Sequence, residues 1–248
     1  MKFNEFDKMM REFEESLDQY IPEDKYMVAR LDGRSFSKLT KYFEKPFSLN
    51  FHMKMLETVK ALMTCGFNVK YGYTQSDEIS LLFDRDEKLF NRKVRKYDSI
   101  LGGTASAAFS LTCGKLAVMD CRMIPLPTKE DVCDYFLWRQ EDSIRNALNC
   151  ACYWALRQNG KSARAASSIL DGESITSKRE LLESFGLSFD ELEPWKKYGS
   201  GMSWESISKA GTNPITGETH TVERKVLTAN ESLPTGLGYI NLIQSYLD

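Results

Sequence analysis

The sequence has few of the residues that mark zinc, disulfide or membrane proteins. Its 248 residues include only two histidines, and its six cysteines form no C-x-x-C pair, so a zinc site is not expected. No apolar run approaches the roughly 18 residues of a membrane span, and the N-terminus "MKFNEFDKMM" lacks a secretory signal. We therefore expect a reduced, cytoplasmic protein with buried thiols and no membrane contact.

The chain also lacks a strong excess of charge of either sign. Its net charge is −2, with 42% hydrophobic and 27% charged residues, which is typical of a globular protein with a full core. The small net charge argues against a protein that coats nucleic acid non-specifically, although it is compatible with a local basic patch. The length fits one large domain or two small ones.

The first half of the chain alternates helical and strand-like patterns. An amphipathic helix is predicted over residues 3–18 because apolar residues recur there at helical spacing. The segments that follow are a strand (26–32), a helix (48–64), two strands (68–75 and 78–83), a helix (87–109) and a strand (116–124). This β-α-β-β-α-β order predicts a ferredoxin-like antiparallel sheet with helices.

The second half begins after Pro125 and Pro127 and is mainly helical. Thr128 with Asp131 predicts the start of a helix that runs to about Gly160. Further starts are predicted at Ser177 with Glu180 and at Ser188 with Glu191, and residues 199–231, with the turn "NPITGE", predict an irregular β-hairpin. The fold class is therefore α+β, with a ferredoxin-like domain over 1–130 and a mainly helical part with a hairpin over 131–248.

Two acidic turns are the first candidate site. Asp32 ends the first strand in "RLDGRSFSKL", and Asp77 occupies the turn in "YTQSDEISLLF". In the predicted topology these carboxylates meet at one edge of the sheet, where they repel each other unless a cation lies between them. Oxygen ligands favour Mg²⁺ over zinc, and Gly33 allows close backbone approach. Either motif alone is also consistent with an ordinary turn, and Glu78 is consistent with a solvated side chain.

Basic residues are concentrated in "RDEKLFNRKVRK". If this segment is helical, Arg85, Lys88, Arg92 and Lys96 form one stripe with Lys93 beside it. Five of the nine residues from 88 to 96 are basic in a slightly acidic protein. A triphosphate or an RNA backbone would fit such a stripe, and a solvated helix face is the alternative.

Four segments together resemble the histidine-tRNA guanylyltransferase family: "RLDGRSFSKL", "SDEISLLF", "DCRMIP" and "WRQEDSIRNALNCACYWAL". The resemblance extends from about residue 5 to residue 230. It implies a palm-like catalytic domain, as in ordinary polymerases, and addition of nucleotides to the 5′ end of tRNA in the 3′-to-5′ direction. Implied partners are tRNA, ATP and GTP, two Mg²⁺ ions and a homotetrameric assembly.

The resemblance also implies roles for individual residues. The catalytic residues would be Asp32 and Asp77, with both carboxylates and the Gly33 carbonyl holding the two metal ions. Nucleotide binding is implied for Arg30, Asp32, Gly33, Arg34, Ser35, Phe36, Ser37, Ser76 and Asp77. Triphosphate binding and 5′-end activation are implied for Lys45, Arg92, Lys93 and Lys96, and contact with the tRNA 5′ end is implied for Asn146 and Asn149.

Two departures from the eukaryotic pattern bear on specificity. Ser37 stands where those enzymes carry a histidine, and Ser143 stands at the histidine of their His-Ile-Asn-Asn motif. This pattern is similar to the bacterial and archaeal "like-protein" branch, which implies template-dependent repair of 5′-truncated tRNA. The alternatives are strict guanosine addition to histidine tRNA, a palm-type nucleotide cyclase and a non-catalytic RNA-binding module.

Overall fold

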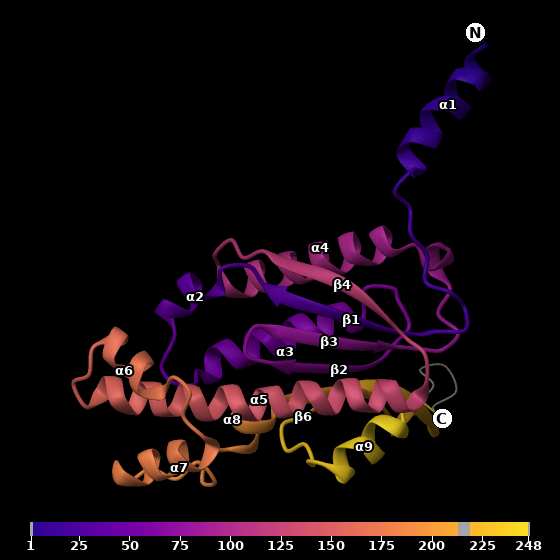
Figure 1. Cartoon of the computed structure of the whole chain (residues 1–248). Coiled ribbons are helices and arrows are strands. Elements are labelled where there is room, and N and C mark those ends of the chain that lie inside the picture. The colour runs from indigo at the N-terminus through magenta and orange to yellow at the C-terminus, as the bar shows by residue number, and fades with distance from the viewer. Residues whose placement is uncertain (1, 213–218, 248) are drawn as a thin grey trace.

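The computed structural model describes residues 2–212 and 219–247. Its helices are α1 (Phe3–Glu15), α2 (Phe36–Leu39), η1 (Thr40–Tyr42), α3 (Leu49–Met63), η2 (Leu89–Arg92), α4 (Val94–Cys113), α5 (Lys129–Gln158), α6 (Ala163–Leu170), α7 (Ile175–Ser184), α8 (Pro194–Tyr198) and α9 (Leu237–Gln244). Its strands are β1 (Tyr26–Gly33), β2 (Val69–Gln75), β3 (Glu78–Phe83), β4 (Met119–Leu126), β5 (Ser200–Thr212) and β6 (Thr219–Asn230). These elements confirm the α+β fold class (Figure 1).

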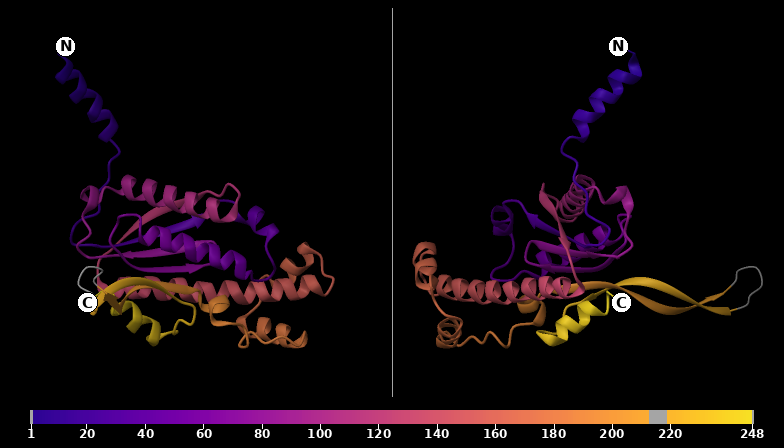
Figure 2. Two further views of the ribbon diagram at one scale, coloured as in Figure 1. Left: turned by 180° about the vertical axis from the view of Figure 1, so that it is seen from behind. Right: turned by 45° about the vertical axis from the view of Figure 1, so that its right-hand side comes forward.

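A single antiparallel sheet organises the molecule, with strand order β4-β1-β3-β2-β5-β6. The first four strands have the predicted ferredoxin-like arrangement. The predicted hairpin is formed by β5 and β6, and β5 pairs with β2, so the hairpin extends the same sheet. Its pairing is continuous from Gly201 opposite Asn230 to Thr212 opposite Thr219, so it is not irregular along the described strands. The two strands project far beyond the body (Figure 2), and "NPITGE" lies outside the described residues.

The sheet is covered on both faces because its central strands are apolar on both sides. One face packs against α3 and α4 through residues such as Leu31, Val59 and Phe109. The other packs against the first half of α5 and against α9, through residues such as Val28, Phe136 and Tyr239. A third cluster joins the second half of α5 to α6 and α7. Within the described ranges, no helix has the length and hydropathy needed to cross a membrane.

The segment predicted as one helix over residues 87–109 is different in the structure. Phe90, Asn91 and Arg92 have φ values of 52°, 52° and 56°, which is left-handed backbone, and α4 begins only at Val94. The predicted basic stripe is therefore wrong, since its members lie on a turn and a helix of different orientation. The sequence pattern failed here because the apolar residues keep their helical spacing across the turn, whereas the backbone of the turn is not α-helical.

Arg92 explains why this turn is stable. The residue is 2% exposed, and its guanidinium donates hydrogen bonds to the backbone carbonyls of Pro22, Glu23, Lys25, Arg85 and Glu87. A planar fork with five N–H donors is suited to this arrangement. Arg92 is thus a structural residue of the turn, a correction to its predicted role at a triphosphate.

Helix ends in the second half were predicted unevenly. Thr128 caps α5 with Asp131 as expected, and α5 ends near Gly160. The start predicted at Ser177 is wrong, because Ser174 caps α7 by accepting from the Ser177 backbone N–H. No helix begins at Ser188, and α8 starts instead at Pro194. A serine followed by a glutamate three residues later is common enough inside a helix or loop to mislead.

The N-terminal helix is formed as predicted, although it ends at Glu15, three residues earlier than expected, and none of its residues is buried against the described part of the chain. α1 contains no buried residue, and it stands away from the body in every view (Figures 1 and 2). Its apolar stripe remains exposed, with Phe3 at 76% and Phe13 at 69% exposure.

Candidate active site

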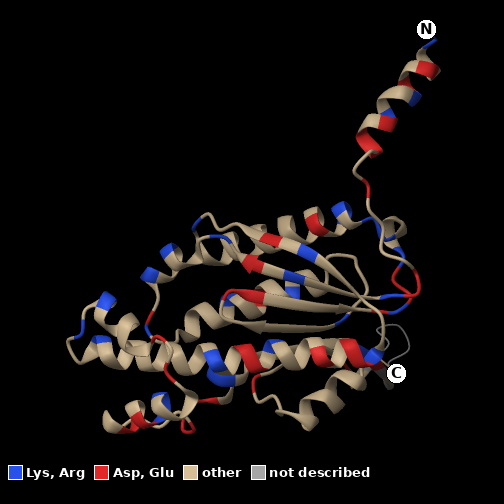
Figure 3. Ribbon diagram, viewed as in Figure 1, with Lys and Arg blue, Asp and Glu red and all other residues tan. Residues whose placement is uncertain are grey.

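A row of acidic residues crosses three strands of the sheet. Asp32 on β1 lies opposite Glu78 on β3 and opposite Asp120 on β4. Directly opposed residues of antiparallel strands share a face, so these three carboxylates occupy the face that α5 covers further along. Arg30 and its partner Arg122 form the next row. Figure 3 shows both signs of charge close together on these strands.

Asp77 lies at the tip of the β2–β3 hairpin. The connection is Ser76-Asp77, and Ser76 adopts φ 52° to make the tight turn. The Ser76 hydroxyl donates to the Asp77 carboxylate over 3.1 Å. The Gly33 N–H donates to the Asp77 carbonyl over 3.2 Å, which ties the end of β1 to this tip. The fold thus brings together the two turns that carry Asp32 and Asp77.

Gly33 is required by its neighbours. A Cβ added to it would lie 2.4 Å from the Phe36 ring, and Phe36 is 2% exposed in the core. The side chain of Phe36 therefore packs in the core. Its neighbours Arg34, Ser35 and Ser37 are exposed. Only backbone groups of Phe36 are available for nucleotide contact.

Both acidic side chains titrate abnormally. The pKa of Asp77 is raised, mainly because the group is buried, and the charge of Asp32 raises it further. The pKa of Asp32 is also raised, again mainly by burial and next by Glu78. A bound cation would reverse the cost of ionising this pair.

The donor set fits a hard divalent cation, with two carboxylates and the nearby Gly33 carbonyl supplying only oxygen. Among the residues that the structure describes, no group of three or more His, Cys, Asp or Glu side chains is spaced to hold a metal ion. A cation here would therefore take its remaining ligands from backbone, water or substrate, as Mg²⁺ commonly does.

A cavity of about 350 Å³ opens beside the hairpin tip, between α3 and α5. Ser76, Asp77, Lys45 and Asn146 all line it, so these predicted residues share one space. Its walls also include residues that the sequence reasoning missed: Phe43, Phe47, His52, Trp154, Trp195 and Lys196. An aromatic, partly cationic cavity next to an acidic pair is suited to a nucleotide.

His52 and Trp195 form one wall of this cavity. Their rings are stacked with centroids 4.4 Å apart, and His52 Nε2 lies 2.8 Å from Glu231 Oε1 and 3.3 Å from Ser200 Oγ. Burial lowers the pKa of His52 despite Glu231. These contacts join three separate parts of the chain, around residues 52, 195–200 and 231, which is why no local motif could reveal them.

Other predicted residues do not reach the cavity. Asn149 is exposed and does not line it. Ser143 is 1% exposed and donates to the Lys197 carbonyl, so it holds α8 in place. Arg34, Ser35 and Phe36 line a second, more open hollow with Tyr42 and Lys115.

Lys93 and Lys96 lie at the opposite end of β1 from Asp32. Arg92, next to Lys93, donates a hydrogen bond to the Lys25 carbonyl, just before β1 begins. Asp32 lies near the other end of β1, six positions after Tyr26, which is about 20 Å along a strand. Lys93 also pairs with Asp18 over 2.7 Å, and Lys96 lies over the Phe90 ring. The single chain therefore does not bring these lysines to the acidic pair.

The raised pKa of Asp77 makes a prediction about stability. A carboxyl whose pKa is higher in the folded state than its ordinary 3.8 loses folding stability as the pH rises through that folded pKa. Asp77→Asn should therefore raise Tm at pH 7 in EDTA by about 2 °C or more, and the gain should shrink as the pH falls toward 4. Mg²⁺ should raise the wild-type Tm and leave that of Asp77→Asn unchanged; equal Mg²⁺ responses would contradict this account.

Comparisons with known proteins identify the family. Residues 7–127 match the family described as "tRNAHis guanylyltransferase", and residues 130–236 match its "Thg1 C terminal domain". The chain belongs to the tRNA(His) guanylyltransferase family. The tRNA(His) guanylyltransferase of Schizosaccharomyces pombe is 30% identical over 85% of this chain and 82% of its own length. That of Neurospora crassa is 30% identical over 84% and 76%, respectively. The chain is thus a nucleotidyltransferase of this family.

Solved structures support the fold. A bacterial tRNA(His) guanylyltransferase (Thg1)-like protein in complex with GTP superposes with a TM-score of 0.77, covering 98% of this chain and 99% of its own at 23% identity. The Saccharomyces cerevisiae tRNA(His) guanylyltransferase gives 0.72, covering 82% of this chain and 93% of its own at 24% identity. The ferredoxin-like sheet with the helical second half is therefore the family fold.

Proposed function

We propose that the protein repairs the 5′ end of truncated tRNA, adding nucleotides in the 3′-to-5′ direction as directed by the opposite strand. A 5′-monophosphate would first be activated with ATP or GTP. Activation would transfer a nucleotidyl group to the 5′-phosphate and release pyrophosphate. The 3′-hydroxyl of an incoming nucleoside triphosphate would then attack that 5′-phosphate and displace the activating nucleoside monophosphate, whereas a 5′-triphosphorylated end would lose pyrophosphate. The observation that carries the proposal is the cavity in which Asp77, Lys45 and Asn146 meet, in a chain of this family.

The residues of the site divide the work of binding and orienting. Asp32, Asp77 and the Gly33 carbonyl would hold two Mg²⁺ ions, which lower the pKa of the attacking hydroxyl and offset charge on the phosphates. The aromatic wall offers flat surfaces to a nucleobase. Lys45, which lies 6.0 Å from the Trp154 ring centroid, would pair with a phosphate, and Asn146 would orient the tRNA end.

Ser37 and Ser143 are the basis for repair in place of strict guanosine addition. A histidine could donate a long or charged hydrogen bond to substrate, and serine cannot. Ser143 is committed to the Lys197 carbonyl, so it contributes no contact to RNA. With fewer contacts selecting one tRNA, base pairing becomes the main guide. We place the chain in the bacterial and archaeal branch on this ground, and we propose a homotetramer by analogy with the family.

The test compares two substrates at saturating ATP and Mg²⁺. We expect kcat/KM for a tRNA lacking its first nucleotide, opposite a template C, to exceed that for full-length histidine tRNA by about tenfold or more. The expected ratio corresponds to a difference of about 1.4 kcal/mol in transition-state stabilisation. A preference for the full-length histidine tRNA would reject repair and leave the nucleotidyltransferase chemistry standing.

Rival functions have distinct outcomes in the same assay. A palm-type nucleotide cyclase would release pyrophosphate from a nucleotide without tRNA. A non-catalytic RNA-binding module would bind tRNA without regard to Mg²⁺ and incorporate no labelled nucleotide.

A further inference from the structure

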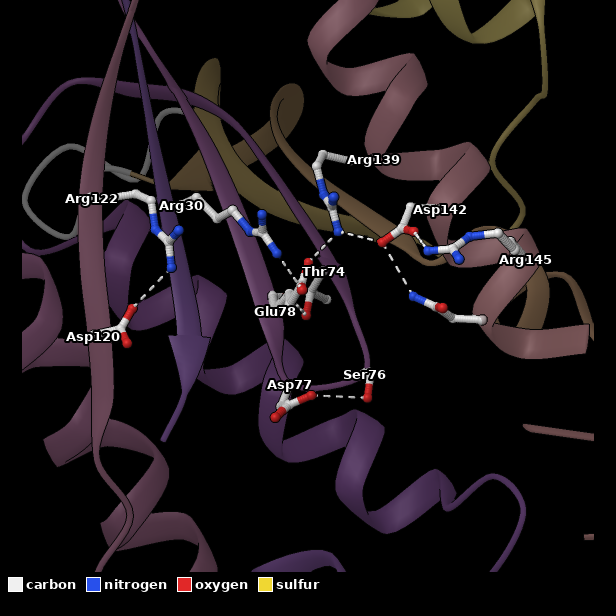
Figure 4. Close-up of polar contacts among 11 residues, drawn as sticks. Arg30, Thr74, Ser76, Asp77, Glu78, Asp120, Arg122, Arg139, Asp142 and Arg145 are labelled. Carbon is white, nitrogen blue, oxygen red and sulfur yellow. Dashed lines mark hydrogen bonds and ion pairs between the residues drawn. The ribbon is translucent and has the colours of Figure 1, made fainter. Parts of the chain in front are cut away.

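Glu78 lies where a third metal ligand could stand, but its carboxylate contacts two arginines. It follows Asp77 in the chain and lies opposite Asp32 across the sheet. Its Oε1 accepts from Arg30 Nη2 over 2.5 Å, and its Oε2 accepts from Arg139 Nη2. Figure 4 shows its carboxylate between the two guanidinium groups, with Asp77 turned toward the hairpin tip. Both oxygens of Glu78 are thus occupied by arginines.

Arg30 is the cation that could otherwise neutralise Asp32. The two residues are separated by one position on β1 and share a face. Arg30 is largely buried, and its Nε donates no hydrogen bond within the described chain. A freed Arg30 would therefore gain by pairing with Asp32.

Arg139 is held differently. It is 5% exposed on α5, and it also pairs with Asp142 one turn further on, over 2.9 Å. Asp142 in turn accepts from the Asn146 amide over 3.2 Å. Loss of Glu78 would leave Arg139 anchored on its own helix, whereas Arg30 would lose its only hydrogen-bonding partner among the described side chains.

We infer that Glu78 is a positioning residue that holds Arg30 away from Asp32, so that the Asp32–Asp77 pair stays available to a divalent cation in place of an arginine. The charges of Arg30, Arg139, Glu78 and Asp142 cancel, and Arg145, which also pairs with Asp142, adds one exposed positive charge at the outer end of the network. This inference rests on the proposed metal-binding role of the Asp32–Asp77 pair and assigns to Glu78 a function without metal coordination.

The test measures Mn²⁺ affinity by calorimetry at pH 7, without nucleotide or tRNA. Glu78→Gln should weaken Mn²⁺ binding by about tenfold or more, because a guanidinium then competes for Asp32. Adding Arg30→Gln should restore most of the affinity. Adding Arg139→Gln, which gives the same net charge, should restore little, because Arg139 stays on Asp142. Arg179→Gln, which removes an exposed Arg–Asp pair in the helical part, serves as the control and should change nothing.

Three outcomes would overturn the inference. Unchanged affinity in Glu78→Gln would mean that Glu78 does not influence the cation. Failure of Arg30→Gln to restore binding would make Glu78 a direct ligand. Equal restoration by Arg30→Gln and Arg139→Gln would reduce the effect to net charge. Failure of the proposed function is a separate result, since Mn²⁺ binding that depends on Asp77 could occur in a protein that adds no nucleotide.

Discussion

Asp77→Asn and Asp32→Asn are each expected to lower 5′-end activation and nucleotide addition together, by at least about 10³-fold. Both steps would use the same pair of ions, and removal of a single preorganised hydrogen-bond donor at a developing oxyanion already costs about 10²–10³ in rate. The measurement is single-turnover labelling of a 5′-monophosphorylated tRNA with ATP, followed by extension of a 5′-triphosphorylated tRNA.

The control for this pair is Asp190→Asn, which removes a carboxylate with 75% side-chain exposure. It should retain activity near that of the wild type. If Asp77→Asn kept near-normal rates in Mg²⁺, the assignment of the acidic pair to the metal site would be wrong. Loss of one step alone would mean that activation and addition use different sites.

The second large effect is on folding. Arg92→Ala should reduce the free energy of unfolding by about 3–5 kcal/mol, because it leaves the carbonyls that Arg92 satisfies without their donor. In a chain of this size the corresponding fall in Tm is at least about 6 °C. Arg92→Lys should recover only part of the loss, since an ammonium cannot reproduce the planar fork.

Lys88→Ala is the matched control for Arg92, because Lys88 is exposed and pairs only loosely with Glu23 over 3.4 Å. Its Tm should change little. If Arg92→Ala left Tm unchanged and lowered only the activity with triphosphates, the original prediction of a phosphate-binding Arg92 would be restored.

The sequence predicted those features that depend on local patterns. Short apolar runs placed β1 and β3 correctly, and Thr128 with Asp131 marked the start of α5. The order of elements led to the sheet that brings the turns of Asp32 and Asp77 together. The family resemblance, confirmed by the matched domains, added the class of enzyme, which no periodicity contains, and it is the basis for the proposed direction of addition.

Features that depend on distant contacts were not predictable. The left-handed turn at Phe90 to Arg92 is held by carbonyls from two separate segments. The wall formed by His52 and Trp195 joins residues 143 positions apart. From the sequence, Glu78 is consistent with a solvated strand residue, and only the structure shows that Arg139 of α5 pairs with it.

The most direct test of the account is extension of a 5′-truncated, 5′-monophosphorylated tRNA with ATP, all four nucleoside triphosphates and Mg²⁺. The product is sized at single-nucleotide resolution and its 5′ end is sequenced. We predict growth at the 5′ end by the missing nucleotides, each complementary to the opposite strand, and no growth with Asp77→Asn. A tRNA of unchanged length, or one extended at its 3′ end, would contradict the account.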